Sequence, residues 1–69
     1  MKPIFLDYDV VEARAQLAGA VAPGTIGTVV MVFATEPPSY EVEFVNLAGE
    51  SLAVLTVMED ALTFVQRGS

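Results

Sequence analysis

The side chains in this sequence that could do chemistry are carboxylates and hydroxyls, because the chain contains no His and no Cys. Two carboxylate pairs are candidates, Asp7 with Asp9 and Glu59 with Asp60. A calcium ion takes about 6–8 oxygen ligands, and neither pair has the spacing of an EF-hand loop. Paired carboxylates that hydrolyse glycosides flank a cleft of about 5–9.5 Å, for which so small a domain has little room. We therefore expect no metal site and interpret both pairs as solvated charges at strand ends.

Nucleophilic catalysis is not supported by the hydroxyl groups. Ser39, Ser51 and Ser69 lie in or beside expected turns or at the terminus, and no imidazole is present to act as their base. Gly24 and Gly27 lead into an expected strand and are not followed by Lys, which argues against a phosphate-binding loop. The sequence predicts a protein that is not an enzyme and that carries no catalytic residues and no cofactor.

The charge balance argues against one class of partner. Three Lys and Arg residues stand against nine Asp and Glu, which gives a net charge of −6. Because nucleic-acid binding commonly neutralises about 6–10 phosphates, we expect no nucleic-acid partner.

The longest uncharged stretch, 15–35, is broken by Gly and Pro, which argues against a membrane-spanning helix. The apolar run 3–6 is too short for a signal peptide. We expect a cytoplasmic protein with no membrane partner.

The pattern along the chain predicts an all-β domain. Turn residues separate five expected strands, at residues 7–13, 25–35, 40–46, 51–57 and 62–65. The Ala-rich segment 14–24 is interpreted as a long loop, with one helical turn around residues 12–18. Thr56 and Glu59 have capping-box spacing, but the few residues left before the last strand favour a 3₁₀ turn.

This order of elements is that of a small SH3-like five-stranded barrel with a 3₁₀ turn before the last strand. We expect one domain over residues 1–69, with its core at about 7–65. Segment 23–30 has the G-x-x-G-x-V pattern with which KOW domains begin a β-strand. We interpret this pattern as structural: Gly24 allows a turn, and Gly27 allows a bend or a close approach of the backbone.

Aromatic side chains could line a groove for proline-rich peptides, but we expect them in the core. They are Tyr8, Phe33, Tyr40, Phe44 and Phe64.

Association is expected because hydrophobic residues make up 54% of a chain that has no disulfide or zinc site to support its small core. Four-residue loops at 36–39 and 47–50 would place Phe33 and Leu55 opposite Val42. The outer face of the sheet would then carry, beside Glu41 and Glu43, five aliphatic residues: Val30, Val32, Val45, Leu52 and Val54. We predict that these five form the interface of a homo-oligomer or with a partner protein.

Four segments together carry a resemblance to a known family: residues 8–11, 23–30, 40–45 and 49–57. The family that they resemble is a group of small bacterial proteins, the domain of unknown function DUF4926, and the resemblance covers about residues 7–65. The chain departs from the family pattern at 13–22, which is nearly all Ala, Leu and Val here. The resemblance implies an SH3-like barrel and brings no catalytic residues.

The function that these observations favour is a non-catalytic protein-interaction module that self-associates or docks on a partner protein. Two alternatives stay open. An antitoxin-like protein would use its acidic surface to mask a basic partner protein. A small-molecule binder would form its site at a subunit interface.

Overall fold

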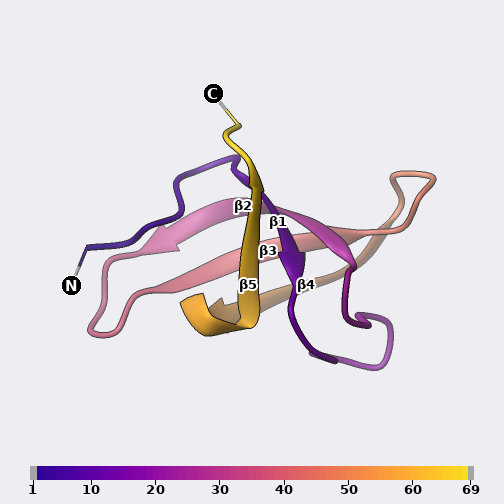
Figure 1. Ribbon diagram of the computed structural model, residues 1–69, viewed down its shortest axis with the longest axis horizontal. Helices are drawn as coiled ribbons and strands as arrows, with labels where there is room; N and C mark the ends of the chain where they lie inside the picture. Colours follow the sequence, from indigo (N-terminus) through magenta and orange to yellow (C-terminus); the bar gives the residue numbers. More distant parts are fainter. Residues whose placement is uncertain (1, 69) are drawn as a thin grey trace.

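The computed structural model describes residues 2–68 and shows five antiparallel strands in one sheet (Figure 1). The strands are β1 (Val10–Ala13), β2 (Ile26–Phe33), β3 (Ser39–Val45), β4 (Ser51–Met58) and β5 (Leu62–Gln66), and the 3₁₀ turn η1 (Glu59–Ala61) precedes β5. The all-β class, the five strands and the 3₁₀ turn are confirmed. Met1 and Ser69, the ends of the expected domain, lie outside the described residues.

The sheet is open, which differs from the closed barrel expected from the sequence. Its strand order is β4-β3-β2-β1-β5, so β4 and β5 are the two edges, and within residues 2–68 no ladder joins them. Figure 1 shows β5 crossing β3 and β4 at a steep angle. Side chains from both ends of the sheet share one buried cluster, so the β1–β5 end folds over one face of the β2–β3–β4 end.

The core lies between these two ends of the sheet. Its buried residues come from the N-terminal segment, the Ala-rich loop and four strands: Phe5, Val11, Ala13, Val21, Val29, Tyr40, Val42, Phe44 and Leu62. The clearest contribution is from β3, where every second side chain is buried and Glu41 and Glu43 point to the other face. That alternation is the period of a strand with one buried face.

The register between β3 and β4 is as predicted up to Phe44, with Val42 opposite Leu55 and Phe44 opposite Ala53. It then shifts, so that Val45 lies opposite Ser51 and not Leu52. The predicted register between β2 and β3 is wrong, because Val42 lies opposite Val29 and not Phe33. The pairing shifts between Val29 and Met31, so one residue of β2 has no partner there. Such a bulge changes which face the following side chains occupy.

Two local expectations near the N-terminus are also wrong. The first strand begins at Val10 and not at residue 7, because the chain turns at Tyr8, whose φ is +69°. No helical turn forms around residues 12–18. Glu12 is paired on both sides within the sheet, and the chain reverses where Ala18 bridges Val21.

The aromatic residues divide between core and surface. Tyr40 and Phe44 are fully buried, as expected, whereas 62% of Tyr8 and 45% of Phe64 are exposed. Phe5 packs edge-on against Tyr40, with ring centroids 5.2 Å apart. The N-terminal segment therefore completes the core that the expected strands leave open.

Gly27 lies where β2 pairs with both β1 and β3, opposite Val11 and Phe44. A Cβ atom at Gly27 would lie 2.6 Å from Cγ1 of Val42 and 3.1 Å from the carbonyl oxygen of Glu43. These distances support the close approach that the sequence suggested.

The described part of the chain, residues 2–68, contains no helix with the length and apolar character of a membrane span.

Candidate functional site

Asp9 is a structural residue and not the solvated charge that we expected. It is fully buried, and its Oδ2 atom accepts hydrogen bonds from the Arg67 guanidinium at 2.6 Å and the Leu6 N–H at 2.9 Å. Its Oδ1 atom accepts the Gly68 N–H at 3.2 Å. A buried carboxylate needs such donors because it has lost its hydration. Asp9 therefore ties the two ends of the chain together.

Glu59 also serves the fold, through a second hydrogen-bond cluster that is partly buried. Its Oε2 atom accepts the Tyr40 hydroxyl proton and the Ile4 N–H, the latter at 3.1 Å. The Tyr40 oxygen in turn accepts the Ile4 N–H at 3.0 Å and the Phe5 N–H at 3.4 Å. Burial of the hydroxyl, followed by its hydrogen bond to Glu59, raises the pKa of Tyr40. This cluster fastens the N-terminal segment over the core.

Within residues 2–68, carboxylates from different elements do not converge on a cation-binding geometry. Asp9 and Glu59 are held in separate clusters by the donors just described. In the part of the chain that the structure describes, no three acidic side chains could hold a metal ion together. The hydrogen bonds of Asp9 and Glu59 stabilise the fold.

The edge strand β4 contributes no side chain to these two hydrogen-bond clusters. Its sequence, SLAVLTVM, contains no charge, no Gly and no Pro. Ala53, Leu55 and Val57 are half-buried against the core, while the alternate side chains are exposed on the outer face: Leu52, Val54, Thr56 and Met58. One side of β4 pairs with β3, and its other side has no ladder partner among residues 2–68. Unpaired N–H and C=O groups along such an edge can add another strand.

Four of the five predicted interface residues lie on the outer surface, and the fifth does not. Val45, Leu52 and Val54 lie together along the β3–β4 hairpin, with 54% of Val54 exposed. Val30 is exposed at the bulge of β2, across β3 and its two glutamates from β4.

Val32 packs against the core, opposite Tyr40, and Met31 takes the outer position instead. The N-terminal segment also covers this part of β2, since Val32 lines a groove together with Leu6 and Tyr8. The bulge explains the exchange, because it turns the residues after it to the opposite face.

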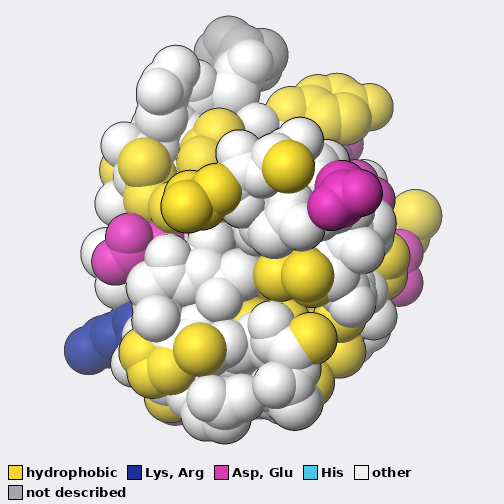
Figure 2. Space-filling view, turned by 90° about the vertical axis from the view of Figure 1, so that its right-hand side faces the viewer, with side chains coloured by type: hydrophobic (Ala, Val, Ile, Leu, Met, Phe, Trp, Pro, Cys, Tyr) yellow, Lys and Arg dark blue, Asp and Glu magenta, His cyan; other side chains and the backbone are white. Residues whose placement is uncertain are grey.

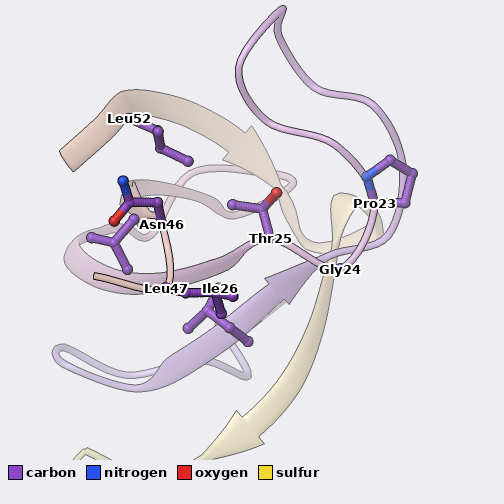
Figure 3. Close-up of a pocket in the computed structure, with 8 residues that line it drawn as sticks. Pro23, Gly24, Thr25, Ile26, Asn46, Leu47 and Leu52 are labelled. Carbon is purple, nitrogen blue, oxygen red and sulfur yellow. The ribbon is translucent and has the colours of Figure 1, made fainter. Parts of the chain in front are cut away.

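A groove of about 530 Å³ lies at the end of the outer face, where β2 begins and β3 ends (Figure 3). Its lining consists of Pro23, Gly24, Thr25, Ile26, Val45, Asn46, Leu47 and Leu52. The polar side chains are already engaged: Asn46 bonds to Glu50 within its turn, and the Thr25 hydroxyl donates to the Ala22 carbonyl. The groove therefore offers mainly apolar contact.

Figure 2 looks onto the right-hand side of Figure 1, where the loop between β3 and β4 lies. Hydrophobic side chains form separate groups there, with carboxylates between them and one basic side chain at the margin. Leu47, at the tip of that loop, is fully exposed. This end of the molecule therefore exposes apolar side chains with carboxylates between them.

Sequence reasoning missed Thr56 and Met58 as surface candidates. The signal was present, because Thr56 and Met58 follow Leu52 and Val54 at the two-residue period of a strand, and residues 52–58 keep this alternation in the structure. Met58 lies beyond the strand expected from the sequence, which ends at residue 57.

Comparison with known proteins identifies the family. The domain of unknown function DUF4926 matches residues 7–64, which extend from the turn before β1 into β5. No curated protein and no solved structure matches the chain. The family match spans most of the sheet and leaves out Arg67, the partner of Asp9. This chain therefore belongs to the DUF4926 family.

Proposed function

We propose that the protein is a cytoplasmic, non-catalytic interaction module that binds another polypeptide along the free edge of β4. The observation that carries this proposal is the strand itself: eight uncharged residues at a sheet edge, with Leu52, Val54 and Met58 exposed beside it. Proteins usually protect such edges with Lys, Pro, a bulge or a covering segment. The pairing with β3 is irregular only near Ser51, so residues 53–58 form a regular ladder.

The same surface favours a polypeptide over a small molecule. A strand that docks on an edge gains main-chain hydrogen bonds, and alternate side-chain contacts give it specificity. A small-molecule site needs a few convergent polar groups in an apolar pocket. The polar side chains of the groove beside Leu52 are already bonded within their own turns. The groove extends the apolar contact area of the edge.

The chemistry-bearing residues support a non-catalytic role. Asp9 and Glu59, the most buried members of the two carboxylate pairs, are committed to backbone and side-chain donors that hold the N-terminal segment. The Tyr40 hydroxyl is committed to Glu59. The structural role of each group accounts for its position in the fold without a catalytic function.

A basic partner protein is the second candidate, favoured by the net charge of −6. Of the three basic residues, Arg67 is already paired with Asp9. Acidic surfaces speed association with basic proteins and depend strongly on salt. A basic partner would bind more weakly as salt is raised, whereas an apolar strand partner would not.

Retention of a partner tests the proposal. The tagged wild-type chain, incubated with host lysate, should retain one polypeptide in stoichiometric amount, either another copy of itself or a different protein. Val54→Lys should lose it, because a lysine at the edge opposes strand addition. Glu43→Gln is the matched control, since Glu43 lies directly opposite Val54 on β3 and the change also raises the net charge by one. Equal retention by both variants, or none by the wild type, would contradict the proposal.

A further inference from the structure

We infer that the polypeptide bound by β4 is a second copy of this chain, paired antiparallel, β4 to β4, about a two-fold axis that passes through Leu55. The two open sheets then form one continuous sheet. This inference rests on the proposed function and names its partner. It follows from the side-chain pattern of β4 and from the position of the acidic residues around it.

The pattern of β4 is complementary to itself. Residues opposite each other in an antiparallel pair point to the same face of the sheet. A two-fold axis at Leu55 places Val54 opposite Thr56 of the partner subunit and Ala53 opposite the partner's Val57. Outer-face residues thus meet outer-face residues, and core-side residues meet core-side residues. No charged side chain belongs to this ladder.

The nearest acidic residues on the outer face stay far apart in this arrangement. Glu43 lies opposite Val54 and Glu41 opposite Thr56, both one strand inward on β3. Between the β3 strands of two paired copies lie three strand spacings of about 4.8 Å, or roughly 14 Å in all. The Debye length at physiological salt is about 8 Å, so repulsion between these carboxylates is largely screened.

Face-to-face packing of the outer surfaces is much less favourable. Packed sheets lie about 10 Å apart with their side chains interleaved between them. The carboxylates of Glu41 and Glu43 would then enter the interface and approach those of the second copy. Burial of unpaired like charges carries a large desolvation cost. Glu41 and Glu43 therefore disfavour face-to-face packing of two copies, whereas they do not oppose pairing along the edge of the sheet.

The acidic residues at the ends of β4 are turned toward their own chain. Glu50 accepts a hydrogen bond from the Asn46 side chain at 2.9 Å. Glu59 is bonded to Tyr40 and to the Ile4 N–H. Asp60 is exposed, but it lies in η1, where the chain has left the strand. The ladder can therefore run the length of 53–57 without an opposing charge.

Cysteine cross-linking tests the register directly, because the wild-type chain has no Cys. In Val54→Cys/Thr56→Cys, each new cysteine lies opposite the other cysteine of the second copy. Cβ atoms of opposite residues lie about 4.5–5.5 Å apart, close enough for a disulfide after small adjustment. We expect a covalent dimer under mild oxidation, seen on non-reducing gels.

The matched control is Glu43→Cys/Glu41→Cys, which has the same spacing on the same face but lies one strand inward. It should remain monomeric on the same gel, because its cysteines are roughly 14 Å from those of the second copy. Equal cross-linking of the two variants would indicate random collision and overturn the inference, as would the absence of cross-linking at positions 54 and 56.

A charge-swap experiment identifies the partner as a second copy. By light scattering at about 100 µM, a concentration at which even weak association shows, the wild type should be a dimer. Val54→Lys/Thr56→Lys and Val54→Glu/Thr56→Glu should each be monomeric and folded, with self-association weakened by roughly 30-fold, because two pairs of like charges lie directly opposite. An equimolar mixture of the two variants should form a heterodimer.

The possible failures separate the inference from the proposed function. A wild-type dimer that neither edge variant disturbs would mean that copies associate through another surface, and the inference falls. A monomeric wild type that retains a different polypeptide, lost in Val54→Lys, would overturn the inference and leave the proposed function standing. A monomer that retains nothing would overturn both.

Discussion

The two edges of the sheet differ in length, charge and attachment. Edge strand β5 has five residues and is followed directly by Arg67, whose guanidinium lies 5.0 Å from the centre of the Phe64 ring and bonds to Asp9. Edge strand β4 has eight residues, no charged side chain, and exposed aliphatic groups on one face. A short edge with a cation over its aromatic residue is protected against strand addition, whereas a long uncharged edge is open to it.

This difference indicates that the molecule protects the edge near its termini and leaves the other edge for a partner. At β5, the protecting group also supports the fold, because Arg67 neutralises the buried Asp9. At β4, the acidic side chains lie one strand inward or are bonded to their own chain. Changes near β5 should therefore affect folding, and changes at β4 should affect association.

The largest effect is expected from Arg67→Met, at the protected edge. It leaves the fully buried Asp9 carboxylate with backbone N–H donors alone. Removing one partner of a buried pair costs about 3–5 kcal/mol, and the exposure of Arg67 to solvent reduces this. We expect a loss of about 3 kcal/mol in the free energy of unfolding, measured by urea denaturation.

The control for this variant is Arg14→Met, which removes the same charge from an exposed position. It should change the free energy of unfolding by less than about 0.5 kcal/mol. If the two arginine variants are equally stable, the Asp9 carboxylate does not depend on Arg67 and the contrast between the edges is weaker than the geometry indicates.

A smaller loss is expected from Gly27→Val, at the strand that joins the two halves of the sheet. Valine favours strands, but its Cβ would lie 2.6 Å from Cγ1 of Val42 and 2.9 Å from Cδ1 of Phe44. Overpacking of this kind costs about 1–3 kcal/mol, so we expect a loss of about 2 kcal/mol by thermal denaturation. Gly19→Ala, at a site with open space around it, should be nearly neutral. A higher melting temperature for Gly27→Val would contradict the close approach.

The sequence predicts the parts of this fold in which one local pattern decides the structure. The alternation of residues 40–46 identifies β3, and the short turn after it sets the register with β4 correctly. The register of β2 could not be predicted in the same way. Every residue from Val29 to Phe33 is apolar, so no alternation of polar and apolar residues marks the bulge after Val29.

The structural role of Asp9 could not be predicted from the sequence, because its donors come from distant positions. Arg67 and Gly68 lie at the other end of the chain, and Leu6 reaches Asp9 only through the turn at Tyr8. An Asp in a charged, turn-rich segment is usually solvated, which led to the wrong interpretation. The positions of Val45, Leu52 and Val54 on the outer surface were predicted more closely, because they follow from the β3–β4 pairing. Their role in an interface stays a prediction.

Substitutions at Val32 and Val54, two residues of the predicted interface, should have different effects on folding and on association. Val32 packs against the core, so Val32→Glu should lower the free energy of unfolding by about 1–2 kcal/mol. Val54 is largely exposed, so Val54→Glu should leave the monomer stable to within about 0.5 kcal/mol while reducing dimerisation. Circular dichroism melts of each variant, paired with light scattering, measure both effects. If Val54→Glu unfolds the chain as readily as Val32→Glu, the outer face of β4 belongs to the core.

The smallest effect is expected from ionisation of Tyr40, which fastens the N-terminal segment on the buried face of the sheet. Its raised pKa means that the folded chain keeps the hydroxyl proton at pH values where the unfolded chain releases it. Stability from this site is therefore complete below the ordinary tyrosine pKa of about 10 and falls as the pH rises above it.

Tyr40→Phe keeps the ring against Phe5 and removes the titrating group, so its stability should decline less between pH 9 and about 11 than that of the wild type, measured by urea denaturation. Parallel declines would show that the Tyr40 hydroxyl does not couple folding to pH. Dimerisation through β4 should be the same in both proteins at neutral pH, because Tyr40 contacts the N-terminal segment and η1 and lies on the face of the sheet opposite the exposed side chains of β4.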